Sequence, residues 1–222
     1  MLSETLDDSV WLEPGILRAM VTRREPRARA PWQDGHFIGG HPALDLTNTV
    51  FNRAHPMPDN ELLKTPTDVL TWCESVGLFE DAPALKDGAA DGLAARVRSV
   101  REHVWAAFDA VSRGDVIPGA ALGVLLERSG AGLRAGRLRG ADARLDHLAV
   151  DWGAPGAIPE ALSLLSVHAL FTLPAERVRA CGRCGWLFLD SSRGGRRRWC
   201  SMSTCGNREK ASRHRHAALP AN

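Results

Sequence analysis

Four cysteines near the C-terminus constrain this 222-residue chain more than any other feature. Cys181, Cys184, Cys200 and Cys205 follow the pattern C-x2-C-x15-C-x4-C. Two cysteines separated by two residues, followed within about twenty residues by a second pair, are typical of a zinc site, because zinc takes four soft ligands at the corners of a tetrahedron. Four thiolates leave no open coordination position. We therefore predict one structural Zn2+ and no catalytic metal.

The residues around these cysteines predict a treble-clef-like arrangement of knuckle, hairpin and helix. Residues 181–185 form the knuckle, and 186–189 are expected to form a short strand. A glycine-containing turn at 191–197 would lead to a returning strand at 198–200. A helix carrying the last cysteine and the basic stretch NREKASRHRH would follow. Because such a module is too small to have a core of its own, metal binding should supply its folding free energy.

Charge is distributed unevenly along the chain. Residues 175–222 contain eleven Lys and Arg against three Asp and Glu, a net charge of +8, whereas residues 1–174 carry −6. Such a basic tip favours a polyanionic partner, and nucleic acid is the natural one beside a zinc module. A merely solvated basic face is the alternative. The candidate nucleic-acid contacts are Arg196, Arg197, Arg198, Arg208, Lys210, Arg213 and Arg215.

Apolar periodicity predicts a mainly helical body before the finger. The clearest pattern is Leu93, Val97, Val100, Val104, Phe108 and Val111, which lie on one face of a helix. The stretch 133–152 alternates weakly and indicates a small strand or hairpin. Residues 130–135 spell GxGxxA, but no βαβ pattern surrounds them, so we expect a loop there. The other expected helices cover 42–52, 66–78, 118–128 and 159–172.

These patterns divide the chain into three parts. We expect a flexible arm at 1–33, a helical sensing or dimerisation domain at 34–173 and the zinc finger at 174–219. The chain has no run of eighteen apolar residues, so no membrane span is expected. Its first residues lack the basic start and apolar core of a signal peptide, so we expect a cytoplasmic protein.

Two segments carry a family resemblance. Cys205-Gly206-Asn207-Arg208 closes the cysteine pattern and resembles the CGNR zinc finger. The stretch GGHPALDLTNTV at 39–50, followed by TWCESVGLF at 71–79, resembles the ABATE domain that usually precedes that finger. The resemblance covers roughly residues 35–217 and implies a stress-induced or ligand-responsive bacterial transcription regulator.

Residues in both segments have two interpretations. Asp45, Asn48 and Arg53 would line a ligand pocket, which the resemblance favours, or they would satisfy hydrogen bonds between helices. Arg208 would contact phosphate or base edges, or it would brace the fold through a carboxylate such as Asp190.

The sequence as a whole predicts a DNA-binding transcription regulator rather than an enzyme. A single finger offers few base contacts, so we expect a homodimer that binds spaced half-sites, with a small-molecule effector as a further candidate partner. The alternative is an RNA-binding or protein-interaction zinc module that does not read DNA sequence.

Overall fold

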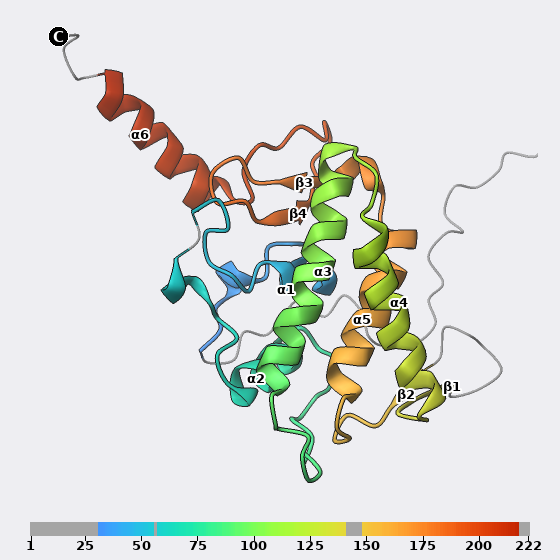
Figure 1. Ribbon diagram of the computed structural model, residues 1–222. Helices are drawn as coiled ribbons and strands as arrows, with labels where there is room; N and C mark the ends of the chain where they lie inside the picture. Colours follow the sequence, from blue (N-terminus) through green and yellow to red (C-terminus); the bar gives the residue numbers. More distant parts are fainter. Residues whose placement is uncertain (1–30, 56, 141–147, 218–222) are drawn as a thin grey trace, which may run out of the picture.

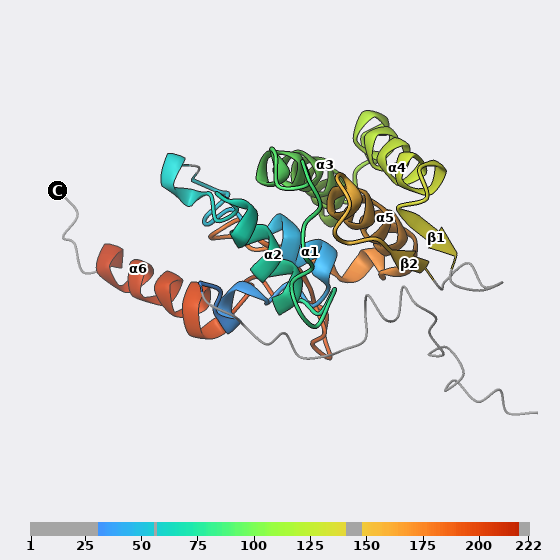
Figure 2. The same ribbon diagram turned by 90° about the horizontal axis from the view of Figure 1, so that it is seen from below.

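Three long helices lie side by side and form one layer of the molecule. The structure, a computed structural model, describes residues 31–55, 57–140 and 148–217. The short N-terminal helices pack against the inner side of this layer, and the zinc finger lies at one end of it (Figures 1 and 2). The helices are α1 (Pro42–Thr47), α2 (Pro66–Ser75), α3 (Leu93–Arg113), α4 (Gly119–Arg134), α5 (Ala157–Thr172) and α6 (Asn207–Ala217).

The strands form two small antiparallel hairpins. One hairpin pairs β1 (Leu138–Gly140) with β2 (Leu148–Val150) beside the layer of long helices. The other pairs β3 (Val178–Ala180) with β4 (Leu187–Leu189) in the finger. The predicted fold class, a mainly helical body with a hairpin element and a C-terminal zinc finger, is confirmed.

Helix α3 is the central element of the core. Its predicted apolar face is buried from Leu93 through Phe108, and α3 contacts α1, α2, α4, α5 and the finger hairpin. Glycines with positive φ flank the helix on both sides, Gly92 at φ 61° and Gly114 at φ 72°. They allow the chain to turn sharply where the helix begins and ends, because glycine adopts this conformation without a steric penalty.

Helix α2 begins as its sequence predicts. The Thr65 hydroxyl accepts a hydrogen bond from the backbone N–H of Asp68, and the Asp68 carboxylate accepts one from the N–H of Thr65. This reciprocal capping box satisfies two backbone donors that an open helix end would leave unpaired.

Helix α4 is longer than predicted, and the expected loop at 130–135 is wrong. The helix continues to Arg134, so the GxGxxA letters lie mostly within it. A Cβ atom on Gly132 would lie 2.9 Å from both Glu160 Oε2 and Leu138 Cδ1. Glycine is therefore required there because α5 and β1 approach the α4 backbone closely.

The N-terminal part of the body differs from its prediction in two places. Helix α1 ends at Thr47, so the expected helix at 42–52 is only half formed. Trp32, which we assigned to the flexible arm, is buried, and its indole N–H donates to the backbone oxygen of Asp68. Residues 1–30 of that arm lie outside the described residues. Within the described ranges, no helix combines the length and apolarity that a membrane crossing requires.

The close approach at Gly132 generates a matched pair of substitutions. Gly132→Ala should lower the free energy of unfolding by about 1–3 kcal/mol, because its methyl group overpacks against Leu138 and Glu160. Gly123→Ala, in the same helix with no atom within 4 Å of the added Cβ, should raise it by about 0.5–1 kcal/mol. Urea unfolding of the two variants tests both signs. Equal effects at the two positions would contradict the packing explanation.

Candidate metal centre

The four cysteines converge on one point. Their sulfur atoms lie within 4.8 Å of one another, and Cys200 Sγ lies 3.7 Å from the sulfurs of both Cys184 and Cys205. Four sulfurs bonded tetrahedrally to zinc at roughly 2.3 Å lie about 3.8 Å apart, so the cluster has the size that zinc requires. Hydrogen bonds from the thiols of Cys184 and Cys200 lower the pKa of Cys181, whereas the same contacts raise the pKa of Cys184 and of Cys200. The cysteines fit a single structural zinc site.

The finger reaches this geometry through a hairpin that differs from the predicted one. The knuckle that carries Cys181 and Cys184 connects β3 to β4, and the hairpin register pairs Val178 with Leu189. Residues 198–200 form no strand, so the predicted returning strand is wrong. The partner of β4 lies before the first cysteine rather than after the glycine turn. The second pair of ligands is instead held by the turns around Cys200 and Cys205.

The last ligand lies in a wide turn that leads directly into α6. Residues Met202–Gly206 form one π-helical turn, and α6 begins at Asn207. The Asn207 side chain donates to the backbone oxygen of Ser203, 3.3 Å away, so it closes the turn around Cys205. This hydrogen bond gives Asn207 a structural role in the finger. The direction of α6 is consequently set by a residue that is itself a metal ligand.

Polar contacts from α1 and the loop that follows it hold the finger against the body. The Asn48 amide donates to the Leu187 backbone oxygen at 2.8 Å and accepts from the Leu187 N–H at 2.9 Å. The amide thus pairs with β4 as a neighbouring strand would. The Trp186 indole N–H donates to the Val50 oxygen at 2.7 Å, and the Ala54 N–H donates to the Cys184 oxygen at 3.2 Å. We call these contacts the body–finger joint.

Asp45 supports this joint from inside the body. Its carboxylate accepts a 2.7 Å hydrogen bond from the Gly39 N–H, and the Gly39 oxygen accepts one from the N–H of Leu189 in β4. A Cβ atom on Gly39 would lie 2.8 Å from the Asp45 carboxylate, which explains the glycine. Burial raises the pKa of Asp45 to about 7, and the Gly39 hydrogen bond opposes that rise.

Arg53, the third residue predicted to line a ligand pocket with Asp45 and Asn48, also has partners inside the protein. Arg53 donates to the backbone oxygen of Thr47 and forms two hydrogen bonds with the Glu102 carboxylate. All three side chains therefore have partners inside the protein, which is the alternative interpretation. The pattern of polar residues in the sequence cannot distinguish a ligand pocket from hydrogen bonds inside the protein. A buried amide needs hydrogen-bond partners in either case.

The predicted nucleic-acid contacts fall into two groups. Arg197 belongs to the finger itself, since its guanidinium donates to the Cys200 oxygen and lies 4.9 Å from the centre of the Phe188 ring. Asp190 accepts from the backbone N–H groups of Ser192 and Arg197, and these bonds outweigh its burial and lower its pKa to about 2. Asp190 therefore does not pair with Arg208.

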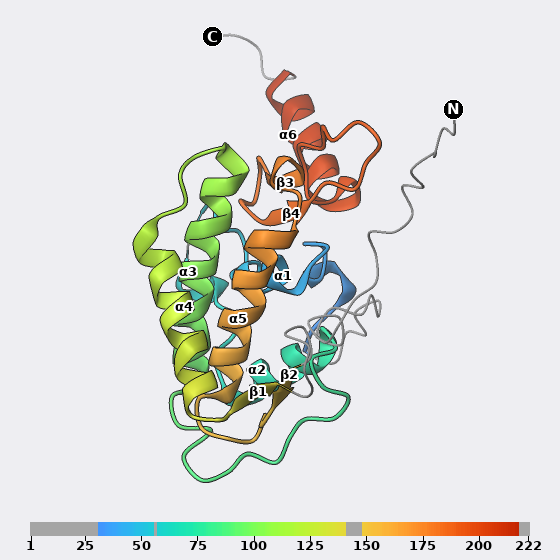
Figure 3. The same cartoon turned by 90° about the vertical axis from the view of Figure 1, so that its right-hand side faces the viewer.

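The remaining predicted contacts are exposed. Figures 1 and 3 show α6 extending from the finger away from the layer of long helices. Within the described part of the chain, its cations form no hydrogen bond or ion pair with protein groups, whereas Arg183 in the knuckle is paired with Glu209. The exposed members are Arg196, Arg198, Arg208, Lys210, Arg213 and Arg215.

Comparison with known families agrees with both halves of this architecture. Residues 40–175 match the ABATE family model, described as "Putative stress-induced transcription regulator". Residues 177–218 match the model of the CGNR zinc finger. A search of curated proteins found no match.

The cysteine arrangement predicts a defined response to a thiol-reactive mercurial. Blocking the four ligands should release one zinc per chain, because each lost thiolate removes a bond to the metal. Cys73 is fully buried, and burial raises the pKa of its thiol, so it should react only after unfolding. A metal-sensitive dye and intact-mass spectrometry measure both quantities. Zinc that stays bound after all four thiols have reacted would contradict this ligand set.

The raised pKa of Asp45 predicts how stability depends on pH. The folded protein binds this proton more tightly than the unfolded chain, so its contribution to the free energy of unfolding falls as pH rises toward about 7. Asp45→Asn keeps an oxygen for the Gly39 N–H but cannot ionise. Between about pH 5.5 and about pH 7 the wild type should lose on the order of 2 kcal/mol relative to the variant. Urea unfolding of zinc-loaded samples tests this, and parallel pH profiles would contradict it.

Proposed function

This chain belongs to the ABATE family of stress-induced transcription regulators, and from that premise we propose that it regulates transcription by binding DNA through its zinc finger. The observation that carries the proposal is the exposed helix α6, whose cations lack protein partners within the described residues. A helix of eleven residues is about 16 Å long, enough to lie in a major groove. We propose a regulatory rather than a catalytic role, acting in the bacterial cytoplasm.

The proposed division of labour follows from the positions of the charges. Lys210, Arg213 and Arg215 would neutralise phosphates along α6, with Arg208 at its first turn. Arg196 and Arg198 would contact the backbone beside the groove, whereas Arg197 would act only through the finger fold. The acidic body, with a net charge of −6 over residues 1–174, would be repelled by DNA, so the finger would be the part that makes contact.

The number of contacts supports a homodimer on DNA. One short helix offers few base contacts, and a second copy bound to an adjacent half-site would double them. A small-molecule effector acting on the body would then control how the two fingers are presented. These two elements of the proposal extend beyond the family match.

Selection from fragmented genomic DNA with zinc-loaded protein tests the proposal. We expect enrichment of a defined motif, and no enrichment with a Cys200→Ser variant, because loss of a zinc ligand should unfold the turn that positions α6. Absence of a motif, with the zinc content confirmed, would reject DNA readout by the free protein. Equal or tighter binding to structured RNA would favour an RNA-binding module instead.

Salt dependence of the affinity tests the assigned residues. Arg213→Gln should weaken binding and lower the slope of log affinity against log salt by about 1, because one phosphate contact is lost. Arg134→Gln, an exposed arginine at the end of α4, is the matched control and should leave the slope unchanged. Equal effects of the two substitutions would show that overall charge, rather than α6, governs binding.

A further inference from the structure

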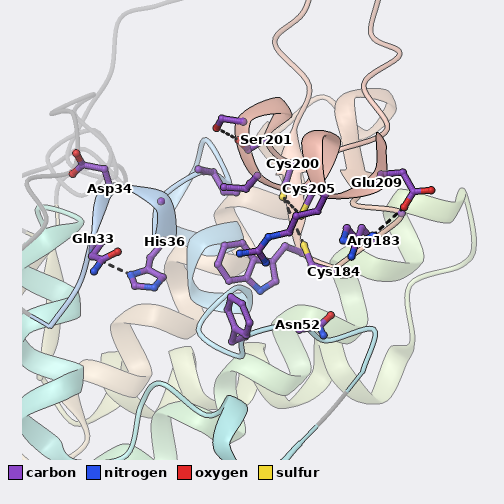
Figure 4. Close-up of a pocket in the computed structure, with 18 of the residues that line it drawn as sticks. Gln33, Asp34, His36, Asn52, Arg183, Cys184, Cys200, Ser201, Cys205 and Glu209 are labelled. Carbon is purple, nitrogen blue, oxygen red and sulfur yellow. Dashed lines mark hydrogen bonds and ion pairs between the residues drawn. The ribbon is translucent and has the colours of Figure 1, made fainter. Parts of the chain in front are cut away.

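A large cavity lies between the body and the finger, beside the metal centre. Its volume is about 690 Å³, within the range of pockets that bind small molecules. One wall comes from the body, through residues 33–38 and the loop after α1. The other wall comes from the knuckle, the turn around Cys205 and the first turn of α6. Figure 4 shows His36 and Asn52 on the body side, across from Cys184 and Cys205.

Aromatic rings from both the body and the finger line the cavity. Phe51 is 46% exposed, although it is a large apolar side chain, and its ring meets the Trp186 ring edge-to-face with centroids 6.2 Å apart. The centroid of the His36 ring lies 6.5 Å from that of Trp186. Ile38 also lines the cavity. Trp186 is itself only 5% exposed, so a flat apolar molecule in contact with both rings would mainly remove the exposed face of Phe51 from water.

The finger side presents an arginine without a partner. Arg208 lines the cavity and has no hydrogen bond or ion pair to any residue that the structure describes. Arg183, the other arginine there, is neutralised by Glu209 at 3.1 Å. A guanidinium has five N–H donors in a planar fork that matches a carboxylate or phosphate. Arg208 therefore favours an acidic group on any molecule in this cavity.

The other polar groups of the cavity are compatible with an anion. His36 Nδ1 accepts from the Gln33 N–H, so its proton lies on Nε2, and burial lowers its pKa, which keeps the ring neutral. Figure 4 shows the carboxylates of Asp34 and Glu209 pointing outward at opposite edges of the site. Cys200 and Cys205 are 3% and 7% exposed, so of the ligands that line the cavity only the half-buried Cys184 presents appreciable surface to it.

We propose that this cavity binds a small organic anion with a flat apolar body, whose acidic group pairs with Arg208 while its apolar part covers Phe51 and Trp186. Arg208 lies in the first turn of α6, the helix assigned above to DNA. An anion in the cavity would occupy Arg208 and compete with a phosphate for it. The regulatory part of this inference rests on the proposed function: by linkage, the anion weakens DNA binding and DNA weakens anion binding by the same factor.

A pair of fluorescent probes tests the binding site without DNA. The probes are 1-anilinonaphthalene-8-sulfonate, which combines a flat apolar body with a sulfonate, and N-phenyl-1-naphthylamine, which has the same body without the charge. With zinc-loaded protein, Arg208→Gln should weaken binding of the sulfonate by about tenfold, because a charged hydrogen-bond partner is lost. It should change binding of the neutral probe by less than about twofold.

Two further variants identify the site. Phe51→Ala should weaken binding of both probes, since it removes part of the aromatic wall that they share. Arg213→Gln changes another exposed arginine of α6, one that does not line the cavity, and should leave binding of both probes unchanged. Circular dichroism and zinc content confirm that each variant is folded. Sulfonate binding that is unchanged by Arg208→Gln, or neutral-probe binding that falls equally, would overturn the inference.

A competition experiment separates this inference from the proposed function. Adding the selected DNA should displace the sulfonate from the wild type, and adding the sulfonate should weaken DNA binding by the same factor. If the protein binds no DNA but Arg208→Gln still weakens the sulfonate, the proposed function fails and the anion site stands. If DNA binds normally and the sulfonate does not respond to Arg208→Gln, the anion site fails alone.

Discussion

The hydrogen bonds between Asn48 and Leu187 decide how the two halves of this chain are placed. One amide satisfies both the N–H and the C=O of a residue 139 positions later. These groups lie on the edge of β4 opposite its partner strand β3. A buried backbone pair left without partners would cost several kcal/mol, so the finger cannot leave the body cheaply. The position of the zinc site against the body, and the cavity between the two halves, depend on these contacts.

The features predicted correctly from the sequence are those that depend on neighbouring residues. The zinc ligands are recognised by their spacing, and helix α2 begins at Pro66 as expected, because its capping box at Thr65 and Asp68 involves only a single helical turn. The apolar face of α3 follows from a period of 3.6 residues. In each case the interacting residues lie within one element or one short module, so the local sequence is enough to predict how they are arranged.

The errors arise where a distant segment decides the outcome. Gly132 resembles part of a nucleotide-binding loop, yet it is glycine because Leu138 and Glu160 pack against it. The predicted partner strand of β4 at 198–200 is replaced by β3, a three-residue segment too short to carry a clear pattern. The sequence left the partner of Asn48 open between a ligand and another part of the protein, because nothing local reveals that it pairs with β4. Phe51 of the body and Arg208 of the finger line one cavity only because the fold brings the two parts together, so neither local sequence predicts it.

The body–finger joint also makes the lifetime of the protein in the cell depend on zinc. Leu187 and Phe188 are fully buried in β4, and the zinc knuckle is what turns the chain into that strand. A chain deprived of zinc would release this strand and leave the Asn48 amide facing the gap. We expect such chains to be degraded by cellular proteases, which cut extended apolar segments. Zinc supply would then set the number of intact regulators in the cell, independently of any signal carried by an effector.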